Sequence, residues 1–93
     1  MKRIEIIANN SVEEDLLREL TLSINNFMFT KINGVHGIGK TEPKMGSSVW
    51  PEENFILIVY CNNEQEKAIR NAIQKTKKIH TLDGIKYFVM GDS

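Results

Sequence analysis

The N-terminal part of the chain switches from a strand-like to a helix-like pattern of apolar residues. Apolar and polar side chains alternate over residues 3–8, which predicts a β-strand with one mostly buried face. The apolar spacing then lengthens to three and four residues, which predicts an amphipathic helix. The apolar stripe of this helix consists of Val12, Leu16, Leu17, Leu20 and Ile24. We expect a capping box at Ser11 and Glu14 to start the helix and Asn25-Asn26 to end it.

A second amphipathic helix is predicted after residue 61. Asn62 or Asn63 can cap its N-terminus, with Gln65 or Glu66 as the side chain that reaches back to the cap. We expect its inward face to be small and apolar. That face would comprise Ala68, Ile69, Ala72, Ile73 and Thr76.

Three further strands complete the pattern. Residues 27–35 are rich in aromatic and β-branched side chains, residues 55–60 are continuously apolar, and a turn at Asp83-Gly84 precedes a last strand over 85–90. The order is therefore βαββαβ, which is typical of the ferredoxin-like α+β fold. We expect one domain, residues 1–93, with a four-stranded antiparallel sheet and two helices on one of its faces.

The third predicted strand is apolar on both sides. Antiparallel sheets with one solvated face normally alternate apolar and polar residues, but Phe55, Leu57 and Val59 alternate here with Ile56, Ile58 and Tyr60. Two helices can cover one face only, so the other face would expose an apolar patch. Another copy of the chain would cover it; alternatively, the long segment between the second and third strands folds back over the sheet.

That segment, residues 36–54, is polar and rich in glycine, and it is long for a connection within a small domain. We expect it to protrude and to bind a ligand or a partner. Residues 34–41 match the written pattern of a phosphate-binding loop, but Pro43 and Pro51 argue against the helix that such a loop requires. The glycines either bring backbone N–H groups close to an anion, with Lys40 as counter-charge, or merely permit a turn.

Composition narrows the function classes. Twelve Lys and Arg balance twelve Asp and Glu, which gives no field of one sign for binding nucleic acid. The single cysteine, Cys61, favours a reducing compartment, and no apolar run is long enough to insert in a membrane, so we expect a cytoplasmic protein. No nucleophile lies in a recognisable pattern with a base, so we expect no enzymatic activity.

A metal site is the weaker alternative. Six residues are of the types that ligate soft or borderline metals: His36, His80, Met45, Glu52, Glu53 and Cys61. None of them follows the spacing of a helix ligand pair or a C-x-x-C motif. We therefore predict no metal ligands.

Several segments resemble the P-II signal-transduction superfamily. KRIEIIA, followed by a capped helix, resembles the start of that family, and FTKINGVHGIGK resembles its second strand with the G-x-G-[RK] turn. FILIVYC resembles the third strand, and DGIKYFVM the strand after a Gly-Asp-Gly-Lys turn. The resemblance covers nearly the whole chain. It is partial at two points, because the turn before the last strand keeps only its end and the long loop has no tyrosine.

The resemblance implies a homotrimer with ligand clefts between neighbouring copies. Members bind adenine nucleotides there and use the mobile loop to grip an enzyme or a membrane transporter. The ligand-binding residues implied here are Gly37, Gly39 and Lys40 from one copy and Gly84 and Lys86 from the next. The residues implied for the partner are Lys44, Met45, Trp50 and Glu52. The divalent-cation-tolerance proteins share this architecture, so a metal-responsive trimer is the alternative function.

Overall fold

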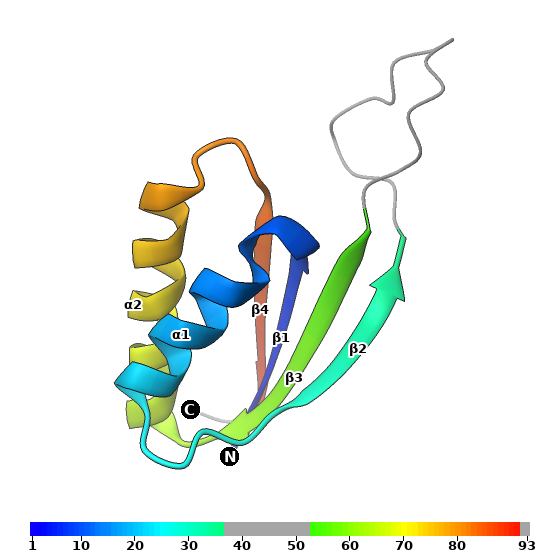
Figure 1. The fold of residues 1–93 in the computed structure, drawn as a ribbon. Coiled ribbons are helices and arrows are strands. Elements are labelled where there is room, and N and C mark those ends of the chain that lie inside the picture. The colour runs from blue at the N-terminus through cyan, green and yellow to red at the C-terminus, as the bar shows by residue number, and fades with distance from the viewer. Residues whose placement is uncertain (37–52, 92–93) are drawn as a thin grey trace, which may run out of the picture.

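The computed structural model describes residues 1–36 and 53–91 and shows a sheet with helices on one face (Figure 1). The four strands are β1 (Lys2–Asn9), β2 (Thr30–Val35), β3 (Asn54–Cys61) and β4 (Ile85–Gly91), and their order in the sheet is β2-β3-β1-β4. Every neighbouring pair is antiparallel. The two helices, α1 (Glu13–Ser23) and α2 (Asn63–Ile79), lie side by side against this sheet. The predicted ferredoxin-like α+β fold is therefore confirmed.

The core lies between the helices and one face of the sheet. Register places Ile4 opposite Val59 and Ile6 opposite Leu57, so alternate residues of the two central strands point toward the helices. The predicted stripe of the first helix is also confirmed, with Leu17 at its partly buried margin. The core residues are Ile4, Ile6, Ala8, Val12, Leu16, Leu20, Ile24, Phe55, Leu57, Val59, Cys61, Ile69, Ala72, Ile73 and Ile85.

The start of α1 differs from the prediction. The side chain of Asn9 accepts a hydrogen bond from the Ser11 backbone N–H at 2.8 Å, which starts a short 3-10 turn, η1 (Asn10–Val12), before the helix. The helix itself begins at Glu13 without a side-chain cap, so the expected capping box at Ser11 and Glu14 is wrong. Ser11 lies inside this 3-10 turn instead of preceding the helix as its cap. At the other end of the helix, Asn26 adopts a φ of 52°, as the expected stop requires.

The start of α2 follows one of the two predicted alternatives. Asn62 and Gln65 form a complete capping box, with each side chain bonded to the other's backbone N–H. The neighbouring Glu66 turns into the protein instead, where its carboxylate lies 2.7 Å from Arg70 and 3.5 Å from Lys2. A buried carboxylate of this kind is tolerated because it has cationic partners. It also ties the first turn of α2 to β1.

β2 is shorter than the predicted range 27–35. The rings of Phe27 and Phe29 stack on each other at 5.3 Å, and regular pairing with β3 starts only at Thr30. The pairing shifts again between Ile32 and Val35, where Gly34 has a φ of +68°. A positive φ is readily adopted by glycine, and such a shift bends an edge strand. The strand therefore has only a short stretch of regular ladder.

Candidate functional site

The helix-free face of the sheet presents three cross-strand rows of side chains. The first row contains Tyr60, Arg3 and Met90, and the second contains Thr30, Ile58, Glu5 and Phe88. The third row contains Ile32, Ile56, Ile7 and Lys86. Most of these side chains are apolar, as the two-sided pattern of the third strand predicts. Among the described residues, no helix covers them (Figure 1).

The large apolar side chains on the helix-free face are unusually exposed to solvent. Ile32, Tyr60, Phe88 and Met90 are between 43% and 59% exposed. Ile7, Ile56 and Ile58 are half-buried by their neighbours within the sheet. Single exposed apolar residues are ordinary on proteins, but a contiguous group across four strands is typical of a surface that another molecule covers.

A polar cluster interrupts the apolar face on β1. The Arg3 guanidinium donates a hydrogen bond to the Tyr60 hydroxyl at 2.7 Å, and it lies 5.6 Å from the centre of the Tyr60 ring. Its other terminal nitrogen is 3.6 Å from the Glu5 carboxylate. The sequence carries no local signal for this cluster, because Arg3 and Tyr60 are 57 positions apart and meet only through the β1–β3 register.

The predicted ligand-binding residues are only partly within the described structure. Gly84 immediately precedes β4 and Lys86 is its second residue; both are exposed. Gly37, Gly39 and Lys40, and the predicted partner residues Lys44, Met45, Trp50 and Glu52, lie outside the described residues. The segment that holds them starts after His36, which directly follows β2.

The two strands next to the predicted ligand-binding residues, β2 and β4, are the opposite edge strands of the sheet. Register brings the end of β2, the start of β3 and the start of β4 to the same end of the sheet. However, β3 and β1 lie between β2 and β4, so three strand spacings, about 14 Å, separate the two edge strands. The end of β2 and residues Gly84 and Lys86 of one chain therefore do not converge on one small ligand.

Glycine at position 84 is not explained by the fold. Its φ lies outside the left-handed region, and a Cβ placed on it would meet nothing within 4 Å. Gly91 contrasts with it, since its φ is +111° and a Cβ there would lie 2.8 Å from the Met1 carbonyl oxygen. The fold would therefore tolerate a side chain at position 84. A substitution there tests whether a bound molecule needs the space that the glycine leaves.

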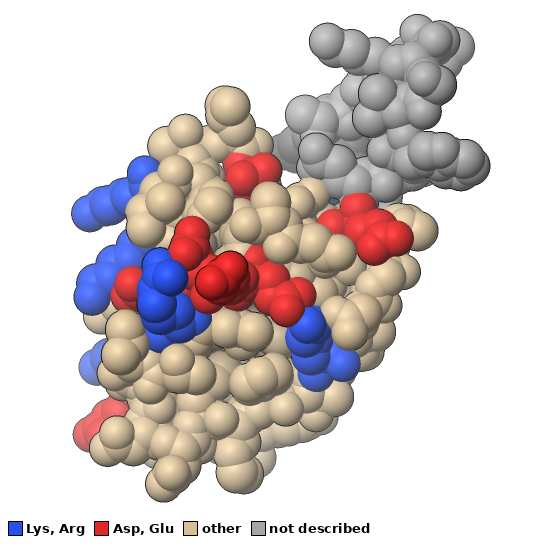
Figure 2. Space-filling model, in the orientation of Figure 1, with Lys and Arg blue, Asp and Glu red and all other residues tan. Residues whose placement is uncertain are grey.

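His80 joins the turn before β4 to both helices. It ends α2, and its Nε2 lies 2.6 Å from Asp15 on α1 while its Nδ1 lies 3.4 Å from Asp83 in the turn. The hydrogen bond with His80 lowers the pKa of Asp15, and Arg18, 2.6 Å away, acts in the same direction. In Figure 2, acidic and basic side chains mix around α1, with no large area of one sign. The ion pairs thus hold the turn that carries Gly84 without forming a charged docking surface.

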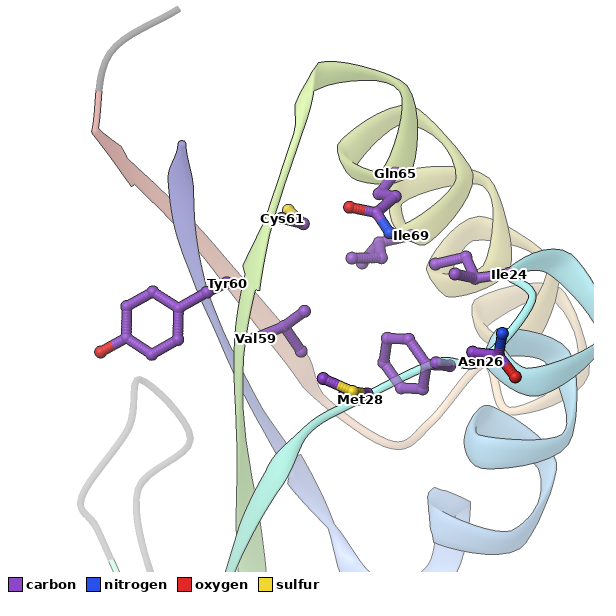
Figure 3. A pocket seen from close by; sticks show the side chains of 9 residues that line it. Ile24, Asn26, Met28, Val59, Tyr60, Cys61, Gln65 and Ile69 are labelled. Atoms are coloured by element: carbon purple, nitrogen blue, oxygen red, sulfur yellow. The ribbon is translucent and has the colours of Figure 1, made fainter.

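A small hollow of about 100 Å³ opens at the other end of the sheet (Figure 3). It lies between the α1–β2 connection, the end of β3 and the first turns of α2. Cys61 and Val59 point into the protein here, whereas Tyr60 points to the opposite side of the strand. Burial, together with the nearby carboxylate of Glu66, raises the pKa of the Cys61 thiol, which makes it a poor nucleophile. The residues that line the hollow are Ile24, Asn26, Phe27, Met28, Val59, Tyr60, Cys61, Gln65 and Ile69.

The candidate metal ligands within the described residues do not come together. His36 follows the end of β2 that pairs with Asn54, whereas Cys61 is seven positions further along β3, about 23 Å away at the strand rise per residue. In residues 1–36 and 53–91, no group of three or more His, Cys, Asp or Glu side chains is placed to hold a metal ion. Met45 and Glu52 lie outside the described residues, whereas Glu53 is described and exposed.

Neither helix in the described part of the chain is long and apolar enough to cross a bilayer.

Two solved structures share this fold over most of their length. A PII-like signalling protein from Thermus thermophilus has a TM-score of 0.66 at 19% identity, covering 96% of this chain and 83% of that protein. CPII from Thiomonas intermedia, solved with bound ADP and bicarbonate, has a TM-score of 0.69 at 17% identity, covering 96% of this chain and 82% of that protein. No family model and no curated protein matches the chain. The resemblance to P-II proteins is therefore confirmed at the level of the fold.

Proposed function

We propose that this chain is a divergent P-II-like regulatory protein that works by binding rather than by catalysis in the cytoplasm. Copies associate through the helix-free face of the sheet into a homotrimer. A small anionic ligand, for which an adenine nucleotide is the leading candidate, binds between neighbouring copies. Residues 36–54 transmit binding to a partner, an enzyme or a membrane transporter.

The observation that carries this proposal is the apolar helix-free face. Its four exposed apolar residues, Ile32, Tyr60, Phe88 and Met90, come from β2, β3 and β4, and the half-buried Ile56 and Ile58 lie on β3. Burial of such a surface against another copy removes apolar area from water, at roughly 25 cal/mol for each Å². The fold shared with PII-like signalling proteins points in the same direction.

The position of the predicted ligand residues supports a site between copies. Gly84 and Lys86 lie at the β4 edge, about 14 Å from the β2 edge at which the segment with Gly37, Gly39 and Lys40 begins. These groups can meet around one ligand if the β4 edge of one copy approaches the β2 edge of the next. An adenine nucleotide is the first ligand to test because CPII, which has the same fold, was solved with ADP.

Two measurements on the purified full chain test the proposal. Sedimentation velocity and light scattering should give the mass of three chains at micromolar concentration. Calorimetric titration with ADP should show binding that Lys86→Ala weakens roughly tenfold or more, since a hydrogen bond or ion pair to a phosphate is lost. Lys75→Ala is the matched control, because Lys75 is exposed on α2 and belongs to no proposed site.

The possible outcomes separate the parts of the proposal. A monomer at these concentrations would remove its structural basis and would favour residues 36–54 as the cover of the apolar face. A trimer that ignores ADP and ATP would keep the assembly and reject the nucleotide. A stoichiometric change in Trp50 fluorescence with zinc or copper, and none with nucleotides, would favour the metal-responsive alternative.

A further inference from the structure

Three charged side chains lie in the rows of the helix-free face: Arg3 and Glu5 on the central strand β1, and Lys86 on the edge strand β4. The two on β1 have opposite charges. Glu5, on the central strand β1, has Ile58 on one side and Phe88 on the other in its cross-strand row. Arg3 occupies the next row, between Tyr60 and Met90. The acidic and the basic side chain are thus surrounded by the residues that self-association would cover.

Neither charge is saturated by residues 1–36 and 53–91. The Arg3 guanidinium has five N–H donors, and within the described residues its hydrogen bond goes to the Tyr60 hydroxyl. The Glu5 carboxylate has about four acceptor positions, and its charged neighbour in the same part of the chain is Arg3 at 3.6 Å. The side chains are 39% and 30% exposed, so water completes their hydrogen bonding in a single copy.

Covering this face removes that water. A purely apolar partner would leave a guanidinium and a carboxylate buried with incomplete hydrogen bonding, which strongly opposes association. A second copy instead brings one Arg3 and one Glu5 of its own, so each spare donor can find a spare acceptor. In a closed ring, every copy gives its arginine to one neighbour and its glutamate to the other.

We propose that Arg3 and Glu5 form ion pairs between copies of this chain and thereby set the register in which the helix-free faces meet. This inference rests on the proposed self-association and adds its specificity. The Tyr60 hydroxyl acts as a positioning group, because its hydrogen bond directs the guanidinium along the face. Pairs of this kind select a partner and an orientation as well as adding affinity.

Charge reversal tests the proposal on the full chain. Arg3→Glu and Glu5→Arg should each raise the protein concentration of half-assembly roughly 30-fold or more, because like charges then face each other across the contact. When the two variants are mixed, native mass spectrometry should find mixed oligomers in excess of either variant's own oligomers. An ion pair confined to one chain cannot produce that preference, because mixing leaves every chain unchanged.

Controls keep the result interpretable. Lys75→Glu reverses a charge on the exposed side of α2 and should assemble as the wild type does. Glu5→Gln keeps the shape of its side chain, and Arg3→Gln keeps a polar side chain without the charge. These two variants replace the reversals if circular dichroism shows that the reversals do not fold, and weaker assembly of each supports the proposal. Wild-type assembly by both reversals, with no preference in the mixture, overturns the inference and leaves the proposed trimer intact. A monomeric wild type overturns both.

Discussion

The two faces of the sheet receive similar side chains from β3 but bury them very differently. Phe55 and Leu57, which point toward the helices, are fully buried. Ile56 and Ile58, one position along the same strand, are half-buried, and Tyr60 is 59% exposed. The strand alone therefore does not determine burial; the presence of a covering layer does. Where a strand is apolar on both sides and the chain supplies one layer of helices, the second layer is expected from another molecule.

The largest expected effect comes from truncation on the helix-covered face. Leu57→Ala should lower the free energy of unfolding by about 2–5 kcal/mol, because it leaves a cavity in the core. Ile58→Ala, one position away, should lower the free energy of unfolding of the single chain by less than about 1 kcal/mol. Urea unfolding at matched protein concentration measures both, at a dilution where the chains are separate. Equal losses would contradict the difference between the two faces.

A charge placed on the helix-free face should have the next largest effect, on assembly rather than on folding. Ile58→Lys puts an ammonium group in the middle row of the apolar face and should weaken association by roughly 100-fold, or about 2.7 kcal/mol. Far-ultraviolet circular dichroism should be unchanged, since Ile58 lies on the side of β3 that faces away from the helices. Analytical ultracentrifugation across a concentration series gives the result, and undiminished assembly would show that this face is not the interface.

Two glycines at the edge strand β4 allow a similar comparison between an effect on folding and an effect on binding. Gly91→Ala should destabilise the fold by roughly 1–3 kcal/mol, because its φ of +111° and its approach to the Met1 carbonyl both disfavour a side chain. Gly84→Ala should leave the melting temperature unchanged and weaken ADP binding, since only an outside molecule would contact its Cβ. Thermal denaturation and calorimetric titration separate the two effects. Unaltered ADP affinity in Gly84→Ala would remove that residue from the site.

The smallest effect concerns the ion pairs beside the helices. The pKa of Asp15 is lowered in the folded state by His80 and Arg18, so the carboxylate contributes stability above its ordinary pKa of about 3.8. That contribution is lost as the pH falls through the lowered folded value. Asp15→Asn should therefore melt at a lower temperature than the wild type at pH 6, and the gap should close toward pH 3. A gap that stays constant with pH would show that the carboxylate charge contributes nothing.

Local patterns in the sequence were sufficient to predict most of the fold. Alternation, the apolar helical stripe and the Asn62–Gln65 cap depend on residues near each other in the chain, and these predictions are confirmed. The predicted start of α1 was wrong because the chain already turns after Asn9, which caps a 3-10 turn that includes Ser11. The run Asn9-Asn10-Ser11 offers three possible caps in a row, and local signals of similar strength do not reveal which of them will be used.

The polar contacts of the site could not be predicted in the same way. Arg3 meets Tyr60 through strand register, and His80 meets Asp15 across 65 positions because two helices pack together. Such pairs depend on tertiary geometry, and single-sequence patterns carry no direct signal for them. The helix-free face that Arg3 and Tyr60 occupy was nevertheless predictable, because β3 is apolar on both sides while only two helices are available.

The separation of β2 from β4 has a consequence for how such a protein would respond in a cell. If the two halves of a site belong to different molecules, occupancy depends on how many molecules are present as well as on how much ligand there is. Dilution would then release the ligand, and the ligand would in turn hold the molecules together, by the same coupling free energy. The signal that such a protein passes to its partner would then depend on the concentration of the ligand and on the concentration of the protein itself.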